Sequence, residues 1–141
     1  MMKKLIILSL FVLASCAEKK EQEVPKEELI MYEYSEMALL MEQMYEENMA
    51  LKERIENGEE IGVFNTDYVK MHTAEMTDPR DRNDEFEAYS KVFLEAQQRI
   101  YAEGESSKVE AFNGMVNSCV ACHKLSCTGP IPRIEKLRIS N

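Results

Sequence analysis

Residues 28–57 read ELIMYEYSEMALLMEQMYEENMALKERIEN, and the rest of the fold can be argued from this stretch. One set of side chains recurs in alternating steps of four and three residues: Ile30, Tyr34, Met37, Met41, Met44, Asn48, Leu51 and Ile55. A seam with a period of 3.5 residues, kept over more than three heptads, is typical of a helix that packs along one face. Asn57 and Gly58 supply a stop signal. The sequence therefore predicts a long helix over 28–57.

Three further stretches repeat with helical period, over 65–77, 83–103 and 106–124. Pro79 follows the first of them, Gly104 follows the second, and Ser106 is a candidate N-cap for the third. No alternating strand pattern competes with these helices. Short links favour antiparallel neighbours, so the sequence predicts an all-α fold, an antiparallel four-helix bundle. Residues 128–132 cannot continue a helix, and 133–139 are expected to fold back as a short helix or an extended arm.

A CxxCH motif, Cys119-Val120-Ala121-Cys122-His123, lies near the end of the fourth predicted helix. CxxCH is the attachment signal for c-type haem. The spacing lets the two thiols reach both vinyl groups of one porphyrin as thioethers, and the adjacent imidazole then falls where it meets the iron as proximal ligand. The motif predicts one covalent haem c per chain.

The same motif has two other readings, because CxxC also occurs in redox thiol pairs and as half of a zinc site. A zinc site needs further ligands at finger-like spacing, and the chain offers only Cys127 and the distant His72. A thioredoxin-like site expects the motif inside a βαβ pattern, which the sequence does not show. Cys127 is left as an additional thiol, with intermolecular pairing, a free state and a place at the haem edge all open.

Residues 1–16 read MMKKLIILSLFVLASC, a positive start followed by a short apolar run. This pattern is a secretory signal, and the run is too short to span a bilayer as a stable helix. Its end resembles the bacterial lipobox, which predicts a signal peptide over 1–15 and lipidation of Cys16. Residues 16–27 are almost without apolar side chains and are expected to be a lipidated tether, followed by the haem-binding bundle and its short tail over 28–141. An ordinary signal peptide is the alternative.

Export and haem attachment agree on one compartment, because bacteria join c-type haem to its protein outside the cytoplasmic membrane. The expected location is the periplasmic side of a bacterial membrane. The formal charge of −9 argues against a nucleic-acid partner and against binding to anionic lipid, so the lipid is expected to do the anchoring. An acidic surface would suit a basic redox protein as partner at the membrane.

A helical bundle with CxxCH near the end of its last helix resembles the cytochrome c-prime family, or class II cytochromes c, over about residues 28–124. The resemblance implies a haem between the helices near one end of the bundle, with a residue of the first helix over its distal face. It also implies a homodimer formed through the first two helices. The family often continues its last helix with an aromatic-Arg pair after the histidine, whereas residues 124–130, KLSCTGP, break off here.

The distal ligand has several candidates. Met37, Met41 and Met44 lie on the inward seam of the first helix, and comparison with the family favours Met41. A methionine stripe at helical spacing is more often packing than ligation. His72 is the rival candidate, because it is the one of the chain's two histidines that lies outside the CxxCH motif. An open sixth position is the third expectation.

Three functions follow from these features. A membrane-tethered electron carrier fits a haem in a small bundle without another catalytic cluster. A gas-binding or peroxide-reactive haem protein would need an open distal site. A non-haem lipoprotein would use CxxCH for zinc or a thiol pair. The sequence shows no nucleophile–base pair or phosphate loop, and it predicts an electron carrier rather than an enzyme.

Overall fold

The computed structural model describes residues 33–104 and 107–140. The described residues belong to one compact unit, Tyr32–Asn141. The expected signal peptide, the lipidation site at Cys16 and the tether over 16–27 lie outside the described residues. The predicted N-cap at Ser106 is wrong by one residue, because the helix that begins at Lys108 is capped by Ser107, whose hydroxyl oxygen accepts a hydrogen bond from the Glu110 amide at 3.1 Å.

The described residues are helical and contain no strand, which confirms the all-α class. In chain order the elements are α1 (Glu36–Asn57), η1 (Thr66–His72), η2 (Pro79–Asp81), α2 (Asp84–Tyr101), α3 (Lys108–Ser126), α4 (Ile131–Ile134) and η3 (Glu135–Leu137). Here η denotes a 3₁₀ helix. None of the described helices is long and apolar enough to cross a membrane.

Helix α1 begins later than the 28–57 stretch predicts, because residues 33–35 are not helical. Ser35 is the N-cap, and its hydroxyl oxygen accepts a hydrogen bond from the Ala38 amide at 3.1 Å. At the other end Gly58 adopts a left-handed conformation with φ 68°, as the predicted stop requires. The seam holds along the helix, with Met37, Met44, Asn48 and Leu51 among its buried residues.

The helix predicted over 65–77 is wrong in length and type, since only the seven-residue 3₁₀ helix η1 forms there. Side chains from other elements hold this segment. The Glu47 carboxylate on α1 accepts hydrogen bonds from Asn65 at 2.8 Å and from the Tyr68 hydroxyl at 2.7 Å. Arg82 donates to the carbonyls of His72 at 2.8 Å and Ala74 at 2.6 Å. Arg82 thus satisfies carbonyl groups that a continuing helix would have used.

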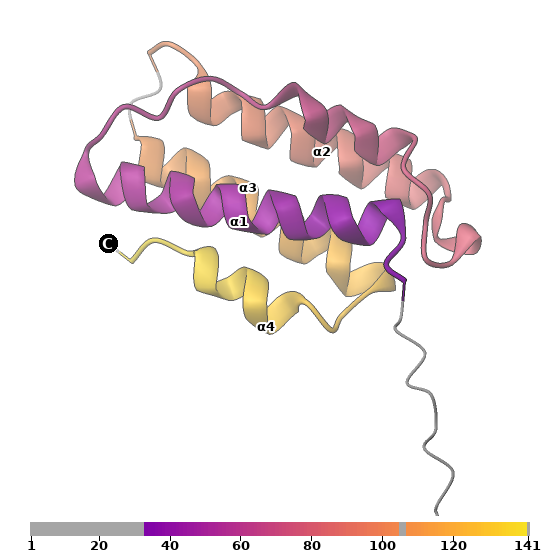
Figure 1. Ribbon diagram of the computed structural model, residues 1–141. Helices are drawn as coiled ribbons and strands as arrows, with labels where there is room; N and C mark the ends of the chain where they lie inside the picture. Colours follow the sequence, from indigo (N-terminus) through magenta and orange to yellow (C-terminus); the bar gives the residue numbers. More distant parts are fainter. Residues whose placement is uncertain (1–32, 105–106, 141) are drawn as a thin grey trace, which may run out of the picture. The chain divides into compact units, whose positions relative to one another are not determined.

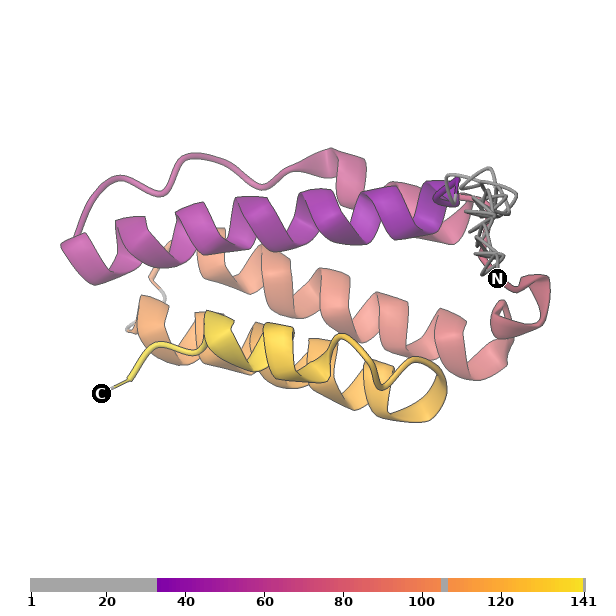
Figure 2. The same cartoon turned by 60° about the horizontal axis from the view of Figure 1, so that its bottom comes forward.

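The elements run back and forth along one direction (Figures 1 and 2). Helices α1 and α2 point the same way, and the segment between them returns along the bundle. Helix α3 packs antiparallel to α2, and the chain then turns back through α4 and η3. The central packing comes from side chains without measurable exposure: Ile100, Phe112, Met115 and Val116. The expected fold-back of 133–139 takes the form of α4 and η3.

Candidate functional site

The CxxCH motif lies in the last two turns of α3 and opens into a pocket of about 300 Å³, which we call the His123 pocket. Cys119, Cys122 and His123 all line it. Its walls come from α1, from the start of α2, from the end of α3 and from the C-terminal segment. The volume lies at the lower end of the ~300–1,000 Å³ range of small-molecule sites. The fold therefore places the three predicted attachment residues on one cavity.

His123 is held in a defined state. Its Nδ1 lies 2.8 Å from the Cys119 carbonyl oxygen, one helical turn back. A carbonyl oxygen can only accept, so Nδ1 carries the proton and Nε2 keeps its lone pair. Burial lowers the pKa of His123, which favours the neutral ring. A neutral imidazole with Nε2 available is the form that ligates a metal, and a backbone partner on Nδ1 is the usual support for such a ligand.

The three cysteines in the described part of the chain are free, with Cys119 and Cys122 half-buried and Cys127 exposed. Burial raises the pKa of Cys119 to about 12 and also raises the pKa of Cys122. Both groups are therefore protonated thiols at neutral pH, whereas thiol exchange and zinc binding use the thiolate. No three His, Cys, Asp or Glu side chains are grouped as a metal site requires within residues 33–104 and 107–140. In the described residues the two thiols therefore lie on the pocket as neutral groups, without a preformed cluster of metal ligands around them.

The three candidate methionines of α1 also line the His123 pocket, so the structure brings them together with the CxxCH motif. Met37 and Met44 are buried at 8% and 6% exposure, and Met41 is half-buried. The aromatic rings of Phe86, Tyr89 and Phe93 add apolar wall from α2. Two thiols, a neutral imidazole and an apolar cavity with thioether sulfurs form a donor set that fits a covalently held haem.

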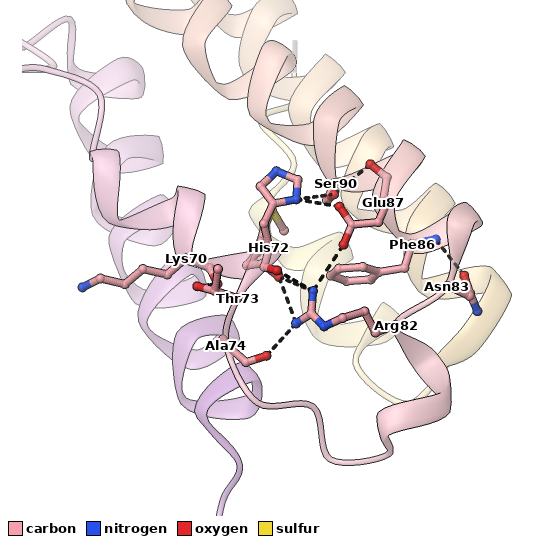
Figure 3. Close-up of polar contacts among 10 residues, drawn as sticks. Lys70, His72, Thr73, Ala74, Arg82, Asn83, Phe86, Glu87 and Ser90 are labelled. Atoms are coloured by element: carbon pink, nitrogen blue, oxygen red, sulfur yellow. Dashed lines mark hydrogen bonds and ion pairs between the residues drawn. The ribbon is translucent and has the colours of Figure 1, made fainter.

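His72 lies apart from this pocket and is not among its lining residues. Figure 3 shows its ring turned toward α2, where Nδ1 lies 2.8 Å from the Glu87 carboxylate and 3.5 Å from the Ser90 hydroxyl. Arg82 completes the group with a hydrogen bond to Glu87 at 3.3 Å. We call His72, Arg82, Glu87 and Ser90 the His72 cluster. Its contacts tie η1 to α2.

The sequence reasoning missed the contribution of the C-terminal segment to the site. Ile134 and Leu137 are buried and line the His123 pocket, and Arg133 lines it as well. The exposed Cys127 also lies on its lining. Apolar residues at steps of three, Ile131, Ile134 and Leu137, were the signal that pointed to a packed helix there.

No protein-family model, no curated protein and no solved structure matches this chain.

Proposed function

We propose that this chain is a membrane-tethered monohaem c-type cytochrome that carries electrons. The observation that carries the proposal is the meeting of two free thiols and a neutral His123, with Nε2 available, on one apolar pocket. Cys119 and Cys122 would hold haem c as thioethers, and His123 would be its axial ligand. When bound, the haem supplies a one-electron Fe(II)/Fe(III) couple.

The protein's own residues have separate tasks in this proposal. The Cys119 carbonyl orients the His123 ring by holding its Nδ1 proton. The apolar walls from α1 and α2 exclude water, and a drier, less polar surround is one of the means by which a protein sets a haem potential. Met41 is the proposed sixth ligand, with Met37, Met44 and His72 as its competitors. His72 is the weakest of them, because its ring is engaged by Glu87 outside the pocket.

The finer architecture is part of the same proposal. We place the chain near the cytochrome c-prime type, as an antiparallel four-helix bundle in which η1 and its flanking segment stand for the second helix. The CxxCH motif would then lie near the end of the last long helix, α3. Homodimer formation is carried over from the resemblance.

The membrane attachment proposed for the cytochrome depends on Cys16. Lipidation there, on the periplasmic side of a bacterial membrane, would keep the carrier beside membrane-bound redox proteins. Such tethering raises the effective concentration of the two partners. The formal charge of −9 favours basic partners and gives no support to nucleic acid.

The test is an optical spectrum of the protein matured with the c-type haem attachment machinery, recorded oxidised and reduced. A low-spin spectrum, with haem retained on the chain after denaturation, is expected. The matched controls are the double variant C119A/C122A, which should lose the retained haem, and C127S, which should keep it. A high-spin spectrum that changes with carbon monoxide would favour the gas-binding alternative. A colourless protein, from cells that mature other c-type cytochromes, would contradict the haem proposal. It would favour a thiol pair or a zinc site at the CxxCH motif instead.

A further inference from the structure

The C-terminal strap, which we define as residues 131–139, covers one side of the His123 pocket through Ile134 and Leu137. It is fastened at its far end by a reciprocal pair of hydrogen bonds between Asn113 and the Ile139 backbone, at 2.9 and 3.0 Å. On the α1 side, Lys52 donates to the Lys136 and Arg138 carbonyls at 3.0 and 2.8 Å. These contacts and the buried apolar side chains fasten the strap at points other than Arg133.

Arg133, on the same strap, is held by contacts to three residues of α1. Its Nη1 donates to both oxygens of Glu42 at 2.6 and 2.7 Å, and its Nη2 donates to Glu46 at 3.2 Å. The guanidinium carbon lies 3.9 Å from the centre of the Tyr45 ring, which also lines the pocket. Stacking on a ring and bonding to carboxylates at the same time is the arrangement that favours arginine over lysine.

The charged side chains that line the pocket are mostly acidic. Among the described residues that line it, Glu42, Asp81 and Glu85 carry carboxylates, and Arg133 is the one with a permanently cationic side chain. A porphyrin such as haem has an apolar body with two carboxylates on one edge. Those carboxylates would meet like charges around this pocket unless a cation were present, and arginine binds carboxylates with charge-assisted hydrogen bonds.

We propose that Arg133 is the residue that binds a carboxylate of the porphyrin in the His123 pocket, exchanging the partner Glu42 for it. The inference rests on the proposed function. Glu42 and Glu46 hold the guanidinium at the pocket in the free protein, with side chains that are 53% and 72% exposed and so return to water readily. Tyr45 keeps the guanidinium plane in place through the exchange.

The test compares two probes on the full-length protein produced without the attachment machinery: iron protoporphyrin IX and its dimethyl ester, which lacks the carboxylates. R133Q should weaken binding of the diacid roughly tenfold or more and leave binding of the ester unchanged. R133K should restore part of the difference. The matched control is R138Q, which removes an equal charge from the same strap at a residue bonded to Asn117 and Glu135. It should leave both affinities as they are.

The outcomes separate this inference from the proposed function. If R133Q weakens the diacid and the ester equally, Arg133 only fastens the strap and the inference is wrong while the haem proposal stands. If the wild-type protein binds neither probe and the matured protein carries no haem, both proposals fail. If the wild-type protein binds neither probe but carries haem once matured, the midpoint potentials of the matured variants test the role of Arg133. R133Q must then lower the potential more than R138Q does, because an unpaired carboxylate stabilises the ferric state; equal shifts would overturn the inference.

Discussion

The two histidines of the described structure lie in contrasting surroundings. His123 is on a regular α-helix, its Nδ1 bonded to a backbone carbonyl, and it lines an apolar pocket. His72 ends a 3₁₀ helix, its Nδ1 bonded to a carboxylate beside an arginine and a serine (Figure 3). Burial lowers the pKa of His123 and favours the neutral ring, and the Cys119 carbonyl accepts the Nδ1 proton, which leaves Nε2 free. The Nδ1 atom of His72 is held by the Glu87 carboxylate instead. Residue type alone therefore does not identify a ligand; here the position of the ring on the pocket lining separates the two histidines.

The largest expected effect is a difference between the two histidines in the matured protein. H123Q should abolish the low-spin haem spectrum, because it removes the one imidazole on the pocket lining. H72Q should leave the spectrum unchanged, since His72 is engaged outside the pocket. Optical spectra of both variants, normalised to protein, check this. Loss of the low-spin spectrum in H72Q would show that His72 moves to the iron. The contrast drawn between the two histidines would then be wrong.

Part of this contrast was predictable from sequence and part was not. The CxxCH motif and the seam of α1 are local patterns, and the seam residues Met37, Met44 and Leu51 are buried as their period predicts. Even the polar seam residue Asn48 is buried, because its amide donates to the Met44 carbonyl and accepts from Gln97. Periodicity reports burial well wherever a helix packs along its whole length.

The segment between α1 and α2 escaped prediction because its conformation depends on distant side chains. Glu47 on α1 bonds Asn65 and Tyr68, and Arg82 takes the carbonyls that a helix through 65–77 would use. Arg133 escaped for the same reason, since its partners Glu42 and Glu46 are about ninety residues earlier in the chain. A periodicity window does not contain both members of the pairs that Glu47 and Arg133 make, and it does not show that the nearby Arg82 side chain binds carbonyl groups.

The second prediction sharpens the pocket side by testing the three methionines one at a time in the matured protein. M41A should remove the long-wavelength charge-transfer band of methionine ligation and lower the midpoint potential. M37A and M44A should keep the band and instead lower the free energy of unfolding by about 2–5 kcal/mol, because they leave cavities in buried positions. Spectra, potentials and urea unfolding check this. Retention of the band in M41A with its loss in M37A or M44A would reassign the ligand.

The third prediction concerns the His72 cluster as a structural latch. R82Q should lower the free energy of unfolding by about 1–3 kcal/mol, because Arg82 satisfies the carbonyls of His72 and Ala74 and also bonds Glu87. The matched control is R80Q, which alters a side chain that is 89% exposed and should leave the free energy of unfolding nearly unchanged. Urea unfolding measures the free energy of unfolding of both variants, and equal m-values would show that the comparison is valid. Equal stability of the two variants would mean that the latch contributes nothing.

The smallest expected effect is the pH dependence of that latch. The hydrogen bond from His72, followed by the charges of His72 and Arg82, holds the pKa of Glu87 below its ordinary value of 4.5. The unfolded chain therefore binds the proton more readily than the folded one, so this contribution is complete above pH 4.5 and is lost as the pH falls through the lower folded pKa. Since the Glu87 side chain is 37% exposed, solvent screening limits the contribution to below about 1 kcal/mol.

E87Q should flatten the acid side of the stability curve by that amount, while E95Q, at an exposed position of the same helix α2, should leave the curve as it is. Urea midpoints recorded across the acid range measure the difference. An unchanged acid slope in E87Q would mean that the carboxylate near His72 titrates alike in the folded and unfolded chains. The ionised Glu87 carboxylate would then add no pH-dependent stability to the His72 cluster, and the contacts at the two histidines would differ in geometry alone.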